Sequence, residues 1–260
     1  MLSPTKEMGM GWLGKVIGGT IGFALGGPVG AVAGAVFGHS FDTEGHSRLY
    51  EERTRLSRNE HAQMTFFVAA FSMLAKMAKA DGTVCDKEIQ AVEQFMKRDL
   101  QLNSESRKAA MSIFKTAADS EQTFDGFARQ FYDMFSTQPR FLEILLDVML
   151  RVSTADGILC EGEENLLLTA VRIFHYRTED YLKLKAKYID RSDVHHAILG
   201  CDRQDSDEFV KTQYRKLVTE YHPDKIASKG LPEEFSKFAA DKFREIQEAY
   251  EMVKKERGMS

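Results

Sequence analysis

Two similar turns, KADGTVCDKE and TADGILCEGE, lie 75 residues apart, and each follows a stripe of apolar residues. Within each stripe the apolar residues recur at i, i+4, i+7 and i+11, which is the spacing of one face of an α-helix. The stripes are Phe67, Phe71, Leu74 and Ala78 before the first turn, and Phe141, Leu145, Val148 and Val152 before the second. A fixed offset over many positions indicates two related helix-turn-helix units. The sequence therefore predicts an all-α helical bundle with an internal repeat over residues 61–185.

The acidic residues of the two turns allow two interpretations. Cys85 and Cys160 stand where a capping Ser or Thr would stand, and Glu88 and Glu163 follow three residues later, as in a capping box. Neither turn has the ligand spacing of an EF-hand calcium loop. Helix capping is the simpler interpretation, although the acidic residues could still gather on one face and bind a cation or a basic partner. We assign no metal ligand.

This portion of the chain resembles the TerB-like all-α domain, in which an Ala-Asp-Gly turn followed by an apolar residue and a glutamate recurs. The resemblance covers about 120 residues. It implies a small helical interaction module without catalytic chemistry.

Glycine occupies every fourth position in residues 14–38, and the 23 residues 16–38 carry no charge. About 20 apolar residues suffice for a helix to cross a bilayer. Residues four apart share one helix face, and a glycine ridge lets a second helix approach closely. We therefore predict a membrane anchor in residues 1–42 that contacts lipid and self-associates, with a signal peptide or a soluble glycine hairpin as alternatives. The glycines of this register are Gly14, Gly18, Gly22, Gly26, Gly30, Gly34 and Gly38.

The basic residues around the glycine-rich segment set its expected orientation. More Lys and Arg follow the segment than precede it, and such residues favour the cytoplasmic side of a membrane. We expect a single-pass anchor, a polar linker over residues 43–60, and cytoplasmic C-terminal domains. The basic residues are Lys6 and Lys15 before the segment, and Arg48, Arg53, Arg55 and Arg58 after it.

The composition excludes several classes of function. The 35 Lys and Arg residues are outnumbered by 39 Asp and Glu residues, so generic nucleic-acid binding, which needs a concentrated basic face, is not expected. The three cysteines are odd in number and form no C-x-x-C pair, which argues against a zinc cluster or a disulfide framework. The sequence indicates no cofactor.

The C-terminal part carries the stretch YRKLVTEYHPDK. We expect a helix from Asp207 to Tyr221, capped by Asp205 or Ser206, because apolar residues recur at helical spacing and Pro223 cannot continue the helix. The apolar positions are Val210, Tyr214, Leu217 and Tyr221. A second helix follows, with an apolar stripe of Phe235, Phe238 or Ala239, Phe243, Ile246 and Tyr250. Two antiparallel helices joined by an exposed His-Pro-Asp loop make a helical hairpin.

A His-Asp pair can serve catalysis, but a hydrolase would also need a nucleophile and an oxyanion site. The chain has no G-x-S-x-G, H-E-x-x-H or P-loop motif. We therefore do not predict an enzyme.

The C-terminal part closely resembles the J domain of the DnaJ family. The segments AILGC, FVKTQYRKLVTEYHPDK and KFREIQEAYEMV match the entry, the second helix with its loop, and the third helix of that domain. The resemblance implies a co-chaperone that docks on a DnaK-type chaperone ATPase and stimulates its ATP hydrolysis. Carried over by position, the docking face is Lys211, Tyr214, Arg215 and Lys216, and the triggering loop is His222, Pro223 and Asp224.

Two features complete the sequence-based prediction. The loop after the His-Pro-Asp motif is extended, as IASKGLPEEF, and we place the J domain at residues 190–260. The order of anchor, TerB-like domain and J domain resembles a family of membrane-anchored DnaJ-like co-chaperones of Gram-negative bacteria, which implies assistance to protein folding at the bacterial inner membrane. The sequence names no client. The alternative function is a membrane scaffold or sensor whose TerB-like domain binds a partner or a divalent cation.

Overall fold

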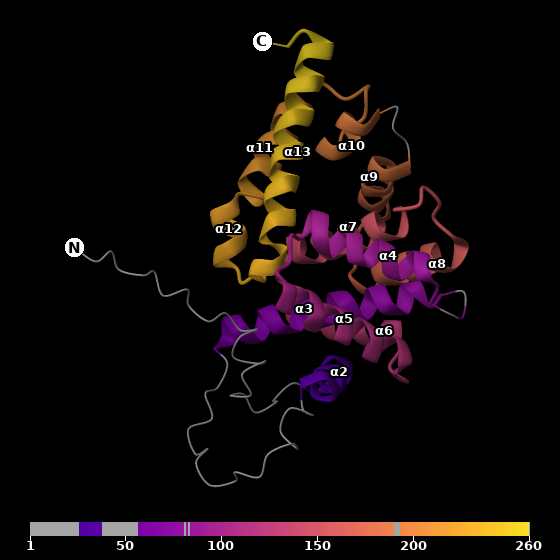
Figure 1. Ribbon diagram of the computed structural model, residues 1–260. Coiled ribbons are helices and arrows are strands. Elements are labelled where there is room, and N and C mark those ends of the chain that lie inside the picture. The colour runs from indigo at the N-terminus through magenta and orange to yellow at the C-terminus, as the bar shows by residue number, and fades with distance from the viewer. Residues whose placement is uncertain (1–25, 38–56, 81, 83, 190–192, 260) are drawn as a thin grey trace, which may run out of the picture.

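The computed structural model describes residues 26–37, 57–80, 82, 84–189 and 193–259. Over these ranges the chain forms twelve α-helices and one π-helix and no strand, which confirms the all-α prediction (Figure 1). The helical bundle consists of α3 (Arg58–Ala78), α4 (Asp86–Gln94), η2 (Phe95–Asp99), α5 (Ser104–Asp119), α6 (Phe124–Phe135), α7 (Pro139–Ser153), α8 (Glu161–Ile173) and α9 (Thr178–Ile189). The C-terminal part consists of α10 (Val194–Leu199), α11 (Asp207–Glu220), α12 (Pro223–Ser228) and α13 (Glu233–Arg257).

The internal repeat is present in the bundle. The first unit is α3 and α4, and the second is α7 and α8, with the same offset of 75 residues between Ala78 and Ser153, where α3 and α7 end. The glycine of each turn has a positive φ, 114° at Gly82 and 88° at Gly157, a conformation that glycine adopts without steric cost. Glycine at these two positions therefore allows the tight turn that follows each helix.

The turn glutamates cap the helices that follow. The Cys160 backbone N–H donates to Glu163 Oε2 at 3.1 Å, and the Glu163 N–H donates to Cys160 Sγ at 3.4 Å. In the first unit the Cys85 N–H donates to Glu88 Oε2 at 2.6 Å. Both glutamates thus satisfy backbone donors at helix N-termini. In the described part of the chain, no group of three or more His, Cys, Asp and Glu side chains is arranged to hold a metal ion.

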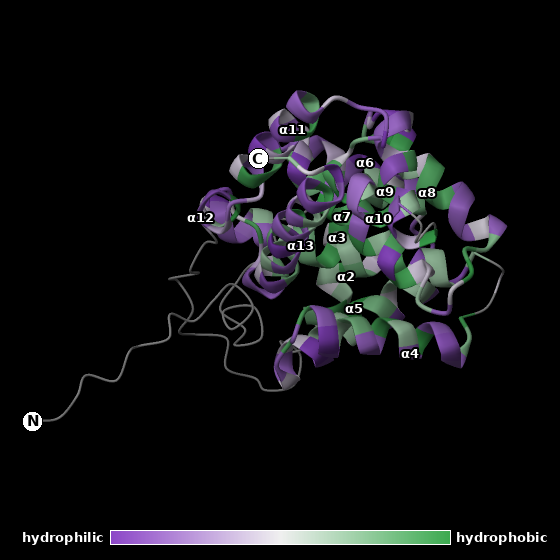
Figure 2. Cartoon of the chain, turned by 90° about the horizontal axis from the view of Figure 1, so that it is seen from above, coloured by the Kyte–Doolittle hydropathy of each residue, from purple (hydrophilic) through white to green (hydrophobic). Residues whose placement is uncertain are grey.

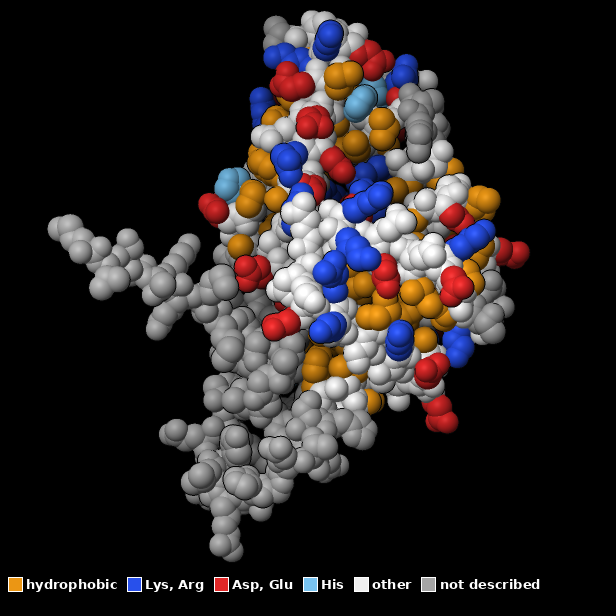
Figure 3. Space-filling model, viewed as in Figure 1, with side chains coloured by type: hydrophobic (Ala, Val, Ile, Leu, Met, Phe, Trp, Pro, Cys, Tyr) orange, Lys and Arg blue, Asp and Glu red, His pale blue; other side chains and the backbone are white. Residues whose placement is uncertain are grey.

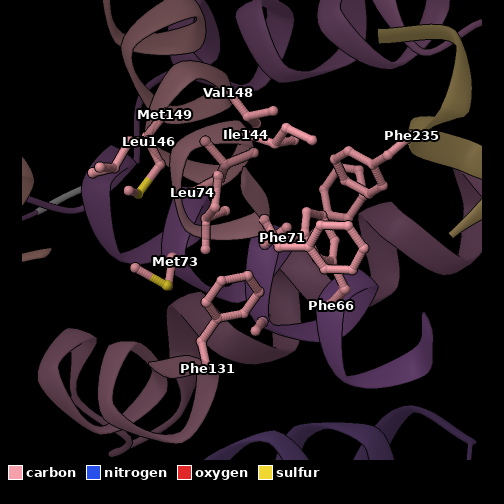
Figure 4. Close-up of a cluster of buried hydrophobic side chains, with 14 of the residues drawn as sticks. Phe66, Phe71, Met73, Leu74, Phe131, Ile144, Leu146, Val148, Met149 and Phe235 are labelled. Atoms are coloured by element: carbon pink, nitrogen blue, oxygen red, sulfur yellow. The ribbon is translucent and has the colours of Figure 1, made fainter. Parts of the chain in front are cut away.

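Helix α3 lies at the centre of the bundle. Its residues from Met64 to Ala75 are almost completely buried on all sides, because α5, α6, α7 and α8 surround it. Aromatic side chains fill the space around Phe66, whose ring centre lies 5.2 Å from that of Phe131 (Figure 4). The ring centre of Phe141 lies 5.8 Å from that of Phe66. Figure 2 shows the same arrangement by hydropathy, with hydrophobic faces turned inward and hydrophilic faces outward.

The described part of the glycine-rich segment is α2 (Gly27–Phe37), an 11-residue helix that packs against α3, α5 and α6. Its buried face consists of Val29, Val32, Ala33 and Phe37, and not of glycines. A Cβ atom added at Gly26 or Gly34 would meet no atom within 4 Å. Among the helices of the described ranges, none combines the length and the apolar character needed to cross a membrane. Gly14, Gly18, Gly22 and Gly38 lie outside those ranges.

Helix α3 begins within the expected polar linker of residues 43–60. The reason is a capping box, in which the Glu60 N–H donates to Ser57 Oγ at 3.2 Å and the Ser57 N–H donates to Glu60 Oε2 at 2.9 Å. The sequence-based boundary between the linker and the bundle missed this motif.

Helices α11 and α13 lie side by side, and α13 runs from the bundle to the far end of the molecule (Figure 1). The segment between them and the first turn of α13 pack on the bundle. Ile226, Leu231 and Phe235 are almost completely buried, and the Phe235 ring centre lies 4.8 Å from that of Phe66 in the bundle core. Gly230 has φ 89° and approaches Asn59 of α3 closely. The extended IASKGLPEEF stretch therefore joins the hairpin to the bundle.

Candidate functional site

Helix α11 presents the residues that the sequence assigned to a docking face. Ser206 caps the helix by accepting a hydrogen bond from the Phe209 N–H at 3.2 Å. Arg215 and Lys216 are exposed, whereas Lys211 and Tyr214 are half-buried. The Tyr214 ring stacks on that of Tyr250 in α13, with a centre-to-centre distance of 3.9 Å and an interplanar angle of 6°. Tyr214 thus contributes to packing between α11 and α13 as well as to the surface.

The His-Pro-Asp motif begins one residue after the end of α11. The helix ends at Glu220, and the next helix, α12, begins at Pro223, so the expected open loop is replaced by a two-residue link, Tyr221 and His222, and a short helix. His222 has φ −55° and ψ 130°, which takes the chain out of the helical conformation. A proline is compatible with the first position of a helix because the N–H that it lacks has no partner there. The Asp224 N–H donates to His222 Nδ1 at 3.3 Å.

All three residues of the motif are on the surface. The side chain of Asp224 is 95% exposed and that of His222 is 52% exposed. Among the ring contacts of the described residues, His222 has one, a T-shaped contact with Phe243 in α13 at 5.8 Å between ring centres. A motif this accessible suits recognition by another protein, since catalytic pairs work in sites that exclude water.

A cavity of about 370 Å³ lies between α11 and the bundle. One wall is lined by residues of α11, among them Lys216 of the expected docking face, and the others by residues of α7, α9, α10, α13 and the segment before α9. Neither His222 nor Asp224 lines it. Figure 3 shows Lys and Arg side chains interspersed with Asp and Glu over one face of the molecule.

A buried charged cluster connects α13 to the bundle. Lys242 Nζ lies 3.1 Å from Glu143 Oε1 and 2.9 Å from Asp147 Oδ2, and both carboxylates belong to α7. Asp147 is completely buried and also accepts a hydrogen bond from the Tyr188 hydroxyl at 2.5 Å. Burial alone would raise the pKa of Asp147, but Lys187 and Lys242 together hold it well below its usual range. Burial would also lower the pKa of Lys242, and the two carboxylates raise it instead.

The sequence reasoning did not find this cluster, although the sequence contains a signal for it. Lys242 follows Phe238 by four residues and precedes Ile246 by four, so it occupies the apolar face of α13. Glu143 and Asp147 lie four residues apart in the otherwise apolar stretch FLEILLDVML. A lysine in one apolar helix face and two acids in another indicate a buried ion pair, because buried charges are paired.

Three family models match the chain in sequence. They are a co-chaperone DjlA transmembrane domain at residues 10–59, tellurite resistance protein TerB at residues 67–186, and a DnaJ domain at residues 194–258. A co-chaperone protein DjlA from Coxiella burnetii is 28% identical over 96% of this chain and 100% of its own length. Those from Shewanella oneidensis and Photobacterium profundum are 28% and 29% identical, over 78% and 79% of this chain and 82% of their own lengths. No solved structure matches.

The chain belongs to the DjlA co-chaperone family. It is a J-domain co-chaperone, and a DjlA protein of this kind acts as a regulator and not as a classical enzyme. The match to the DjlA transmembrane domain indicates a membrane-anchored protein. The DnaJ match includes α10, α11, α12 and α13, and therefore both the exposed His-Pro-Asp motif and the buried Lys242 of this DjlA chain.

Proposed function

We propose that the chain docks through α11 on a DnaK-type chaperone ATPase and stimulates its ATP hydrolysis through His222, Pro223 and Asp224. The observation that carries this proposal is the surface position of the His-Pro-Asp motif, just beyond the end of a helix whose basic residues Arg215 and Lys216 are also exposed. The docking residues on α11 and the triggering residues at the start of α12 thus lie close together in the chain.

Electrostatics supports an acidic partner surface. The whole chain has a formal net charge of −4, so the basic residues of α11 are a local departure from its average. Lys211, Arg215 and Lys216 lie within two helical turns, and Lys211 and Arg215 share one face because they are four residues apart. A local basic face attracts an acidic surface and fixes the orientation of the complex more than it raises its affinity.

The proposal places the chain in the bacterial inner membrane as a single-pass protein with cytoplasmic C-terminal domains that assist protein folding. The glycine register of residues 14–38 supports self-association within the bilayer, because a ridge of glycines on one helix face lets a second helix approach closely. Chaperone and ATP are cytoplasmic, which agrees with the excess of basic residues after the segment.

The test separates docking from triggering. The full chain in lipid nanodiscs is titrated into a DnaK-type chaperone with ATP, and the half-saturating concentration and the maximal hydrolysis rate are measured. Arg215→Ala should raise the half-saturating concentration by about threefold, and less at high salt, because exposed charges are screened there. Asp224→Asn should abolish the stimulation and leave the helical content unchanged.

Asp133→Asn is the matched control, because Asp133 is an exposed aspartate on α6, away from α11. It should behave as the unaltered chain does. Stimulation by Asp224→Asn equal to that by the control would refute the triggering role of the motif.

A further inference from the structure

The end of α11 is held by a residue of the helical bundle. Glu220 is the last residue of α11 and Tyr221 follows it, directly before the His-Pro-Asp motif. Arg140, the second residue of α7, reaches both. Its Nη2 forms an ion pair with Glu220 Oε2, and its guanidinium carbon lies 5.2 Å from the centre of the Tyr221 ring.

Arg140 is itself fixed in place. Its Nη1 pairs with Glu143 Oε2, one turn further along α7, and its side chain is only 16% exposed. A guanidinium that binds two carboxylates through two different nitrogens has a defined orientation, since its donors are arranged in a rigid plane. Burial alone would lower the pKa of Arg140, but Glu143 and Glu220 keep it raised, so the group stays charged.

Tyr221 connects Arg140 to the His-Pro-Asp motif, because it contacts Arg140 and directly precedes His222. Its ring is completely buried, with Arg140 on the bundle side and Lys242 Nζ at 4.9 Å from the ring centre. Phe243, the neighbour of Lys242 in α13, contacts the His222 ring. The motif residues themselves are exposed and have few contacts of their own, so their position depends on the segment that precedes them.

We propose that Arg140 of the TerB-like bundle is a positioning residue for chaperone stimulation, because it sets the orientation of the His-Pro-Asp motif relative to α11. This inference rests on the proposed function. The TerB-like bundle then acts on the partner reaction indirectly, through Glu220 and Tyr221. Such placement matters because a displacement of about 1 Å in a reacting constellation can cost about a hundredfold in rate.

The experiment compares variants of the full chain in nanodiscs by their stimulation of the chaperone's ATP hydrolysis. Arg140→Ala should lower the maximal stimulation by roughly two- to thirtyfold, which is the range by which single mutations typically change the coupling between two sites. The half-saturating concentration should stay close to that of the unaltered chain. Arg140→Lys should restore part of the stimulation, because it keeps the charge but not the two-nitrogen geometry. Arg172→Ala, an exposed arginine on α8, is the matched control and should leave both quantities unchanged.

Glu220→Gln provides a second variant that leaves the Arg140–Glu143 pair intact, so it tests the same contact even where Arg140→Ala fails to fold. It should lower the maximum in the same direction. The proposal would be overturned if folded Glu220→Gln and folded Arg140→Ala gave the same maximal stimulation as the unaltered chain. So would a change confined to the half-saturating concentration, since that would assign Arg140 to docking. Lack of stimulation by the unaltered chain would instead refute the proposed function, and this inference with it.

Discussion

The buried cluster around Lys242 makes a sharp prediction about stability. Lys242→Met removes the ammonium group but keeps a flexible chain of similar length, so the change acts mainly on charge. Glu143 and Asp147 then lose a cation that lies 3.1 Å and 2.9 Å away. Loss of one partner of a buried ion pair typically costs about 3–5 kcal/mol, because it leaves an uncompensated buried charge.

The structure places the expected cost at the lower end of that range. Asp147 keeps Lys187, at 3.6 Å, and the hydroxyl of Tyr188, and Glu143 keeps Arg140. We therefore expect the free energy of unfolding of Lys242→Met to fall by about 3 kcal/mol at pH 7. The measurement is urea unfolding of the full chain in nanodiscs, followed by circular dichroism. Lys255→Met, an exposed lysine on the same helix, is the control and should change stability by less than about 0.5 kcal/mol.

The difference between Lys242→Met and the unaltered chain should also depend on pH. The folded-state pKa of both carboxyl groups is lowered in the unaltered chain, so their stabilising contribution is present above about pH 4 and is lost as the pH falls through the folded-state pKa. In the variant this lowering is smaller, so the difference in the free energy of unfolding should stay nearly constant from pH 7 to about 4 and narrow as the pH falls further. A loss below about 1 kcal/mol at pH 7, or a gap that widens on acidification, would refute the account of the cluster.

Two further predictions concern glycines. Gly230→Ala should lower the free energy of unfolding by about 1–2 kcal/mol, because φ is 89° at this position. Adding Asn59→Ala should not restore the loss, since the Asn59 side chain can move away from the new methyl group while the backbone strain remains. Full recovery of stability in the double variant, measured by urea unfolding, would contradict this reasoning. Gly22→Leu combined with Gly26→Leu should weaken self-association in a bilayer without preventing insertion. Self-association is measured by energy transfer between labelled chains, and an unchanged signal would refute the role of these glycines in helix packing.

Local patterns predicted the helices well because those helices depend on local chemistry. The apolar stripe and the Ser206 cap set the limits of α11, and the sequence placed its end within one residue of Glu220. The Asp-Gly turns and the Glu163 cap were likewise predictable, because each needs only residues close in the chain. The all-α fold followed from these elements.

The contacts between the bundle and the C-terminal part depend on tertiary structure. The sequence assigned Phe235 to the hairpin, whereas it packs on Phe66 in the bundle core. The π-helix at Phe95–Asp99 has no distinct sequence signal, and Arg140 is one arginine among many. The cluster of Lys242 with Glu143 and Asp147 could have been recognised in advance, because these charges interrupt apolar stretches. The role of the docking-face and motif residues remains a prediction that the variants above test.

The central claim is that Asp224 and its neighbours trigger ATP hydrolysis by a DnaK-type chaperone. Its most direct test is single-turnover hydrolysis of ATP preloaded on that chaperone, with the full chain added in nanodiscs. We predict that the unaltered chain accelerates the single turnover and that Asp224→Asn, at the same concentration, leaves it at the unstimulated rate. Equal acceleration by both chains, or by neither when both are folded, would contradict the account.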